Sequence, residues 1–239
     1  MKIHRSGELR ELRGYSVLLY GTNGSGKTHF SSTWPKPLFI VPVIGLNELK
    51  TIEDYDLPYV TFNSIDDLKG KVKELGGMLQ KDPDLFKTLV FDSLTTTQTM
   101  FETELKERSR VDKMEWEDWG KFTTTFVGLL TSLHSWPVHK IWITHTSDTE
   151  KIYALKGDSR QLFPGNCDLI LYSECRDVQG VTQFRVHPNR SGPWPARVRR
   201  SVGPDTVRIP IMGPDPSPCY DLLAPHLGLR SLAEEEPNE

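Results

Sequence analysis

The sequence predicts an α/β fold in which a mostly parallel sheet is flanked by helices and carries a β-hairpin extension near the C-terminus. Apolar runs of strand length alternate with segments of helical pattern, which is the order that crossover connections produce. Runs such as TLVF at Thr88–Phe91 lack polar alternation, as strands buried on both faces do. A glycine-rich phosphate-binding motif follows the first run directly, in the strand-to-helix context that its chemistry requires.

The individual elements are predicted from the spacing of apolar residues. Expected strands cover residues 16–20, 38–43, 59–62, 88–91, 140–144 and 168–172. The first helix is expected to end at Trp34-Pro35, because proline cannot continue it. Expected helices cover residues 27–33, 66–80, 95–108 and 116–133, the last with apolar residues at a period of ~3.6.

After Glu174 the chain changes to β-like pieces with much proline and glycine. Residues 183–187 and 206–211, joined by a turn-rich stretch, predict a hairpin at the sheet edge. Residues 210–218 form a proline-punctuated connector, and residues 220–232 predict a short closing helix. We expect one domain, with its limits at residues 1–233, a core at about 15–175, a β-rich extension at about 176–212 and an acidic tail at 234–239.

The composition predicts a protein of the cytoplasm that does not enter membranes. A formal net charge of −3 over 239 residues gives no reason to expect indiscriminate binding to nucleic acid or membranes. The cysteines Cys167, Cys175 and Cys219 are scattered, so neither a disulfide framework nor a zinc site is indicated. No run approaches the ~20 apolar residues of a membrane span, and the charged N-terminus lacks the apolar stretch of a signal peptide.

The motif GTNGSGKT matches the phosphate-binding loop G-x-x-x-x-G-K-[ST]. The glycines let the backbone wrap an anion, so that successive N–H groups point at the α- and β-phosphates of a nucleotide. In this role Lys27 bridges the β- and γ-phosphates, and Thr28 gives its hydroxyl to Mg²⁺. The alternative is a glycine-rich surface turn. The predicted nucleotide-binding residues are Gly21, Thr22, Asn23, Gly24, Ser25, Gly26, Lys27 and Thr28.

A phosphate loop needs a partner carboxylate for Mg²⁺ at the C-terminal end of a neighbouring strand. Asp92 directly follows the run Thr88–Phe91 and is the candidate, although an ordinary helix cap is the alternative. His145 and Thr146 end another predicted strand at the same edge, where one of them is a candidate sensor of the γ-phosphate or else a hydrogen-bonded turn residue. The predicted catalytic side chains are Lys27, Asp92 and His145.

These segments resemble the RecA-like phage AAA-type nucleotide-binding proteins, which include single-strand annealing ATPases of the Sak type. The likeness begins at SVLLYGTNGSGKTHFSSTWPKPLFI, continues through the Asp92 strand, Trp119-Gly120, IWITHT and DLILYSE, and covers about residues 16–211. It implies a RecA-like P-loop NTPase that binds ATP and Mg²⁺ and acts in DNA recombination, annealing or replication. It further implies the host-cell cytoplasm if the chain is phage-encoded, and it is compatible with a homo-oligomer.

One departure from that family bears on hydrolysis. Its members carry an acidic pair, D-x-E, after the strand that corresponds to Leu38-Phe39-Ile40, and the glutamate would polarise the attacking water. This chain has Val41-Pro42-Val43 there. Glu48 and Glu53 follow, but we expect them on a helix or loop surface. Because a general base contributes ~10²- to 10⁴-fold to rate, we expect an ATPase that binds MgATP but hydrolyses it weakly, without the usual catalytic glutamate.

Two segments are predicted to contact single-stranded DNA. RecA-like proteins face DNA at the position of the long loop 147–166, and its mixture of basic and aromatic side chains suits backbone neutralisation with base stacking. Residues 185–208 are rich in arginine, which makes fork-like contacts with phosphate. The alternatives are a flexible surface excursion and a solvated charged strand face. The side chains concerned are Lys151, Tyr153, Lys156, Arg160, Phe163, Arg185, Arg190, Trp194, Arg197, Arg199, Arg200 and Arg208.

Three classes of function therefore remain open. The first is a RecA-like ATPase of DNA recombination, annealing or replication. The second is a non-hydrolysing nucleotide-dependent switch or scaffold, which the missing acidic pair favours. The third is a small-molecule kinase, for which arginines in residues 190–200 would have to form a lid over the phosphates.

Overall fold

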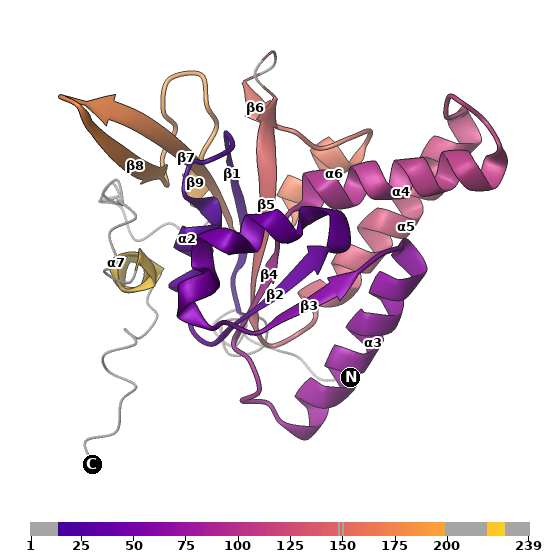
Figure 1. Cartoon of the computed structure of the whole chain (residues 1–239), viewed down its shortest axis with the longest axis horizontal. Coiled ribbons are helices and arrows are strands. Elements are labelled where there is room, and N and C mark those ends of the chain that lie inside the picture. The colour runs from indigo at the N-terminus through magenta and orange to yellow at the C-terminus, as the bar shows by residue number, and fades with distance from the viewer. Residues whose placement is uncertain (1–13, 148, 150, 199–218, 228–239) are drawn as a thin grey trace, which may run out of the picture.

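A computed structural model describes residues 14–147, 149, 151–198 and 219–227 (Figure 1). Within this part of the chain nine strands form a sheet in the order β3-β2-β4-β5-β1-β7-β8, with β6 paired to β5 and β9 to β7. Neighbouring strands in this order are parallel from β3 to β7. Strand β6 is antiparallel to β5, and β8 and β9 are antiparallel to β7. The strands are β1 (Ser16–Gly21), β2 (Pro37–Pro42), β3 (Tyr59–Phe62), β4 (Thr88–Phe91), β5 (His139–Ser147), β6 (Ile152–Tyr153), β7 (Leu169–Val178), β8 (Val181–His187) and β9 (Arg197–Val198).

Helices cover both faces of this sheet (Figure 1). One hydrophobic cluster joins one face to α3, α4, α5 and α6, and a second joins the other face to α2, η2 and α7. The central strands are therefore apolar on both sides, as their lack of polar alternation predicts. The helices are α2 (Lys27–Ser32), the 3-10 helix η2 (Val43–Tyr55), α3 (Ile65–Lys81), α4 (Leu94–Ser109), α5 (Trp116–His134), α6 (Ser159–Gly165) and α7 (Cys219–Leu227).

The parallel arrangement brings the carboxyl ends of the central strands to one edge. Gly21 at the end of β1 is in register with His145 on β5 and Ser173 on β7. The Asp92 N–H, just beyond β4, donates a hydrogen bond to the carbonyl of Ile40 on β2 at 3.1 Å. This edge therefore collects the first residue of the glycine-rich loop and the polar residues that follow β4, β5 and β7.

The hairpin differs from the expected one in its partner strand. β7 continues to Val178, beyond the predicted end at residue 172, and pairs antiparallel with β8. A turn at Gln179 and Gly180, both with positive φ, joins the two strands. The outer half of β7 is exposed, so it lacks the apolar run from which the inner half was predicted. The expected second strand at 206–211 lies outside the described residues.

The prediction of residues 147–166 as an unstructured loop is wrong, because this segment contains β6 and α6. Tyr153 and Phe163 are buried in the hydrophobic core, so neither side chain is available to stack on a base. Lys156 forms an ion pair with Glu102, and the Arg160 Nε donates to the Leu155 carbonyl at 3.0 Å. Much of the composition that suggested a DNA-binding loop therefore serves packing and internal hydrogen bonding.

Several expectations fall on residues that the structure does not describe. These are the acidic tail, the connector at 210–218, and Arg199, Arg200 and Arg208. The closing helix is described as α7, and its continuation past Leu227 lies outside the described part. Among the described helices, none combines the length and apolar character needed to cross a bilayer.

Candidate nucleotide-binding site

The glycine-rich loop joins β1 to α2 at the carboxyl edge of the sheet (Figure 1). Gly24 and Gly26 have φ values of 71° and 84°, in the left-handed region that favours glycine. Gly21 is glycine for a different reason: a Cβ there would lie 2.2 Å from the Ser173 carbonyl oxygen. The motif glycines thus shape the loop and let β7 approach its base closely.

Ser173 fixes the loop from the neighbouring strand, and it is absent from the predicted site. Its hydroxyl, fully buried, donates a hydrogen bond to the Ser25 carbonyl at 2.6 Å. The signal that could have found it is present in the sequence, because Ser173 is the first polar residue after the apolar run 169–172, at the edge where strand ends converge.

Lys27 is buried under the loop and interacts with the backbone of the loop itself. Its ammonium donates to the Gly21 carbonyl at 3.2 Å and to the Thr22 carbonyl at 2.7 Å. Burial lowers the pKa of Lys27, whereas the nearby carboxylates of Asp92 and Glu48 oppose that shift. A cation held by neutral carbonyls in this way is suited to receive an anion.

Thr28 and Asp92 lie together beside Lys27. The Thr28 hydroxyl donates to Asp92 Oδ2 at 2.6 Å, and the Asp92 side chain is buried. Burial raises the pKa of Asp92 to about 6; the bond from Thr28 and the charge of Lys27 act against this shift, and the charge of Glu48 adds to it. A hydroxyl and a carboxylate at hydrogen-bond distance are oxygen donors of the kind that Mg²⁺ takes alongside phosphates and water.

His145 flanks the first glycine of the loop from β5. Its N–H donates to the Thr95 hydroxyl at 3.0 Å, which ties the end of β5 to the start of α4. Its Nδ1 atom is buried and has no hydrogen-bond partner among the described residues. Burial, together with the charge of Lys27, lowers the pKa of His145, while Glu48 opposes this. The imidazole is therefore neutral at physiological pH, with a polar atom to offer.

The two valines that replace the acidic pair lie near the end of β2 and at the start of η2. Val41 is fully buried in the core beneath η2, whereas Val43 is 47% exposed at the start of η2. Glu53 is exposed, as expected. Glu48 is half-buried on η2; its charge opposes the lowering of the pKa of Lys27 and of His145 and adds to the raising of the pKa of Asp92.

The residues at this edge fit a magnesium nucleoside triphosphate. The left-handed glycines open a concave loop, Lys27 is a buried cation, and the Nδ1 of His145 lacks a partner among the described residues. The Thr28 hydroxyl and the Asp92 carboxylate would be the oxygen ligands of the metal. Lys27, Thr28, Asp92 and His145, which were predicted separately from sequence, are thus brought together by the strand order.

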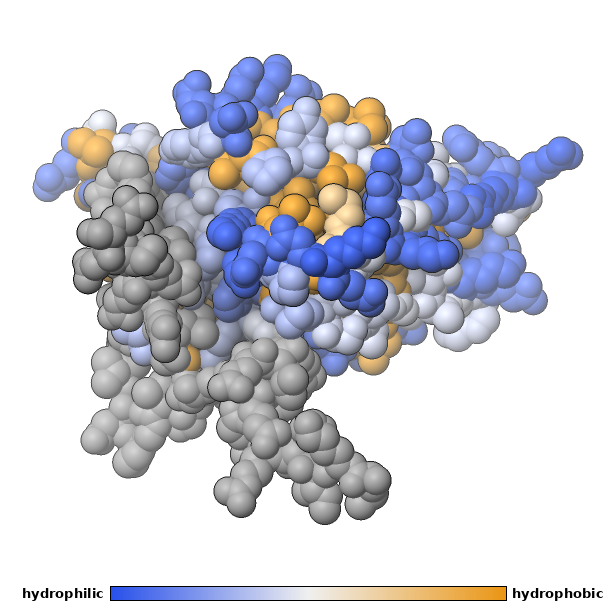
Figure 2. Space-filling model, turned by 90° about the horizontal axis from the view of Figure 1, so that it is seen from below, coloured by the Kyte–Doolittle hydropathy of each residue, from blue (hydrophilic) through white to orange (hydrophobic). Residues whose placement is uncertain are grey.

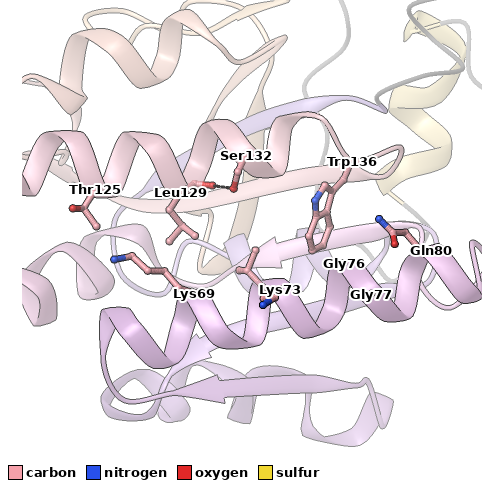
Figure 3. Close-up of a pocket in the computed structure, with 10 residues that line it drawn as sticks. Lys69, Lys73, Gly76, Gly77, Gln80, Thr125, Leu129, Ser132 and Trp136 are labelled. Atoms are coloured by element: carbon pink, nitrogen blue, oxygen red, sulfur yellow. Dashed lines mark hydrogen bonds between the residues drawn. The ribbon is translucent and has the colours of Figure 1, made fainter.

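Two hollows on the described surface lie elsewhere. A groove of about 710 Å³ between α3 and α5 is lined by lysines, small residues and Trp136 (Figure 3). A hollow of about 340 Å³ lies between η2 and β3. On the face seen in Figure 2, hydrophobic residues are interspersed with hydrophilic ones. Neither hollow is lined by a residue of the glycine-rich loop, by Asp92 or by His145, so neither is the triphosphate site.

Comparisons with known proteins agree with this architecture. A family model described as an AAA domain matches residues 13–200. The chain is 27% identical over 176 residues to the SPbeta prophage-derived uncharacterized protein YorG of Bacillus subtilis (strain 168). That match covers 70% of this chain and 53% of YorG, so the chain spans about half the length of this relative.

A solved structure shows the same fold. The KaiC-like protein PH0186 from Pyrococcus horikoshii OT3 is similar with a TM-score of 0.50 and 16% sequence identity, over 84% of this chain and 85% of that one. The predicted fold class, an α/β P-loop NTPase with a RecA-like, mostly parallel sheet flanked by helices, is confirmed. At this identity the likeness concerns the fold alone.

Proposed function

The chain belongs to the AAA domain family, and on that premise we propose that it is a MgATP-binding, RecA-like NTPase with slow intrinsic hydrolysis. Its role is in phage-type DNA recombination, single-strand annealing or replication. The observation that carries the nucleotide assignment is the 2.6 Å bond between Thr28 and Asp92 beside the buried Lys27, at the mouth of a glycine-rich loop. A hydroxyl, a carboxylate and an ammonium group gathered beside this loop support the binding of a metal-bound triphosphate.

Each side chain has a defined task in this proposal. Lys27 neutralises charge on the β- and γ-phosphates, and the loop N–H groups orient the phosphate chain. Thr28 and Asp92 hold Mg²⁺, which when bound withdraws charge from the phosphate oxygens. Neutral His145 offers its Nδ1 atom close to the first glycine of the loop, as a hydrogen-bonding sensor of the γ-phosphate.

Slow turnover follows from the residues at the end of β2 and the start of η2. Both positions at which the resembling family carries acids are valine, and the buried Val41 packs in the core where a carboxylate would be costly. Without an acid at either position, the attacking water lacks the usual base, which is worth ~10²- to 10⁴-fold in rate. Substrate binding is left intact by this change.

The DNA role is supported by the prophage origin of YorG and by arginines on the hairpin at one end of the sheet. Arg185 and Arg190 lie on and just after β8, and Lys151 lies 5.3 Å from the ring centroid of Trp194 nearby. Guanidinium groups on a projecting hairpin are suited to contacts with a phosphate backbone.

A second candidate is a nucleotide-dependent switch or scaffold that does not hydrolyse. The pair Val41 and Val43 favours it directly. In this case MgATP sets the conformation of Asp92 and His145. The Thr95 hydroxyl transmits that conformation to α4, because it accepts a hydrogen bond from the His145 backbone N–H and lies 2.7 Å from the Thr144 hydroxyl.

Calorimetric titration of MgATP, with ATPase assays in the presence and absence of single-stranded DNA, tests these alternatives. The wild type and Lys27→Ala are compared with Lys73→Ala, which replaces an exposed lysine of α3, as the matched control. We expect Lys27→Ala to lose nucleotide affinity by at least about tenfold and Lys73→Ala to retain it. DNA-stimulated turnover supports the ATPase, and binding without turnover supports the switch. Unchanged affinity in Lys27→Ala contradicts both.

A further inference from the structure

The start of α5 carries a tryptophan that the fold leaves in solvent. Trp116 is the first residue of this helix and is 90% exposed. The helix around it is held in place, because the Asp118 Oδ2 accepts the Glu115 N–H at 3.2 Å and caps the helix start. Trp119, on the next turn, packs against the core. Tryptophan is enriched among the residues that anchor protein–protein interfaces in pockets of a partner, so Trp116 is a candidate anchor.

The groove between α3 and α5 has the shape and lining to receive such an anchor (Figure 3). Its volume is about 710 Å³, and the apolar side chains that line it are Val72, Leu129 and Trp136. A Cβ at Gly76 would lie 3.1 Å from the Trp136 ring, so glycine lets the ring rest against α3. A Cβ at Gly77 would meet nothing within 4 Å, so the groove is open there. A hollow of this size admits more than one side chain.

Trp116 cannot enter the groove of its own chain. Thr125 is the groove residue of α5 that lies nearest to it in sequence, and it is about 14 Å further along the helix at ~1.5 Å per residue. The helix is continuous between the two residues, and an indole side chain does not span that distance. The groove can therefore receive Trp116 only from another molecule. Two copies related by a two-fold axis would make the contact twice.

Charge favours this groove over the other hollow on the described surface. Trp116 lies between Glu115 and Glu117, and both glutamates are exposed. The groove is lined by Lys69 and Lys73 and by no acidic residue. The hollow between η2 and β3 is lined by two acidic residues and one lysine, so it would repel the same segment. Complementary charge of this kind selects a partner surface and fixes its orientation.

One charge on each side of the proposed contact is available for pairing. Lys69 already lies 3.4 Å from Asp66, and Glu115 is engaged in capping α5. Within the described part of the chain, neither Lys73 nor Glu117 forms an ion pair. These two residues are therefore the pair whose exchange tests the contact.

The outer surface of α5 permits a second molecule to approach closely. Beyond Trp116, an exposed ridge without charge follows the helix at a spacing of about one turn: Gly120, Thr124, Gly128, Thr131 and Ser135. A Cβ at Gly120 or Gly128 would meet nothing within 4 Å, so packing within the chain does not require glycine at either position. Small residues on a ridge let another backbone pass nearby.

We propose that the groove between α3 and α5 is the docking site for Trp116 and its acidic neighbours from a second copy of this chain. The contact forms a two-fold dimer through the helical face of the molecule. No residue of the glycine-rich loop lines the groove, and neither do Asp92 and His145. The dimer therefore does not depend on the proposed nucleotide function.

Sedimentation of the full-length protein over a range of concentrations tests the association. We expect the wild type to dimerise and Trp116→Ala to raise the dimer dissociation constant by at least about tenfold, because an anchoring tryptophan carries much of the energy of an interface. Val181→Ala truncates a 60% exposed side chain on the β7–β8 hairpin and should match the wild type. A wild type that stays monomeric at the highest concentration, or association that is unchanged in Trp116→Ala, overturns the proposal.

Exchange of charge tests whether the acidic flank of Trp116 meets the groove. Lys73→Glu and Glu117→Lys each bring like charges together and should weaken the dimer several-fold. The double variant restores opposite charges, so it should dimerise more tightly than either single variant. If the effects of the two substitutions simply add, the two residues do not face each other and the docking site is wrong.

Photo-cross-linking locates the docking site directly and does not depend on these charge variants. Trp116 is replaced with the photoreactive aromatic amino acid p-benzoylphenylalanine, and the irradiated dimer is digested and analysed by mass spectrometry. We expect cross-links from position 116 to residues 69–80 or 125–136 of the other copy. Cross-links confined to other segments, or none at concentrations where the wild type dimerises, contradict the assignment.

Discussion

Contacts of two single residues, Ser173 outside the motif and Lys27 within it, hold the phosphate loop in its shape. The Ser173 hydroxyl binds the Ser25 carbonyl, the Ser173 carbonyl requires glycine at position 21, and the Lys27 ammonium binds two loop carbonyls. The loop is therefore preorganised by contacts with β7 and with its own backbone. Preorganisation matters because ordering a loop on binding costs free energy that would otherwise appear as affinity.

Replacing Ser173 with alanine should weaken nucleotide binding without unfolding the protein. The substitution removes the 2.6 Å bond to the Ser25 carbonyl and leaves that buried acceptor without this donor. A lost hydrogen bond of this kind costs about 1 kcal/mol, so MgATP affinity should fall roughly fivefold. Ser132→Ala, which removes a 2.6 Å bond to the Leu129 carbonyl within α5, is the control. Calorimetry that finds equal affinities for both variants contradicts the role of Ser173.

His139 should make the stability of the fold sensitive to acid. Its ring lies among those of Tyr15, Trp34 and Tyr220, and its Nδ1 accepts the Tyr15 N–H at 3.1 Å. Burial, with the charge of Lys140, lowers the pKa of His139 from its ordinary 6.5 to about 4. Between these values the unfolded chain binds more protons than the folded chain.

The free energy of unfolding should therefore be insensitive to His139 well above pH 6.5 and decrease as the pH falls from 6.5 towards 4, by about 2 kcal/mol from this residue at pH 5 and about 3 kcal/mol at pH 4. His139→Gln keeps a side-chain acceptor but cannot titrate, so its stability should decline less over this interval. Urea unfolding at pH 7.5 and at pH 5 measures the difference. Parallel declines in the two proteins would argue against a buried neutral imidazole.

At the scale of elements, the regular parts of the fold follow from sequence and the irregular parts do not. Apolar runs such as TLVF predicted the central strands because a strand buried on both faces has no polar position. The outer half of β7 was not predicted because its side chains are exposed, so its sequence lacks the apolar run that indicates a buried strand. The composition of 147–166 misled because a core aromatic such as Phe163 and a base-stacking aromatic are the same residue type.

The candidate site likewise has features that the sequence predicts and features that it does not. Lys27, Thr28 and Asp92 were predictable because their spacing and strand context are set by phosphate and metal chemistry. Their convergence with His145 depends on the strand order β4-β5-β1, which one sequence does not specify.

The start of α3 offers a prediction confined to one element. Ser64 caps this helix, and its hydroxyl accepts the Asp67 N–H at 3.1 Å. Ser64→Ala should lower the free energy of unfolding by about 1 kcal/mol, because a backbone donor loses its partner. MgATP affinity should not change, since none of the predicted nucleotide-binding residues lies on α3. Chemical denaturation and calorimetry on the same samples check both parts, and a loss of affinity would indicate that α3 and the loop are coupled.

At the scale of the whole molecule, charge is distributed unevenly over a chain with a small net charge. The β7–β8 hairpin projects at one end of the sheet, and the groove between α3 and α5 lies at the other (Figures 1 and 3). Each region carries exposed or partly exposed cations: Arg185 and Arg190 at the hairpin, and Lys69 and Lys73 at the groove. Because each region carries two such cations, variants that remove the same charge from either region can be compared to locate a surface that binds nucleic acid.

If single-stranded DNA binds the hairpin, the double variant Arg185→Gln/Arg190→Gln should bind it more weakly, and the dependence of log affinity on log salt should become shallower by about 1.4, roughly 0.7 for each lost phosphate contact. Lys69→Gln/Lys73→Gln removes the same charge and should leave both quantities near those of the wild type. MgATP affinity should be the same in all three proteins, because neither pair belongs to the phosphate loop. Fluorescence anisotropy with a labelled oligonucleotide at several salt concentrations measures this. Equal losses in the two variants would mean that DNA senses only net charge, and an unaffected arginine variant would place the DNA elsewhere on the molecule.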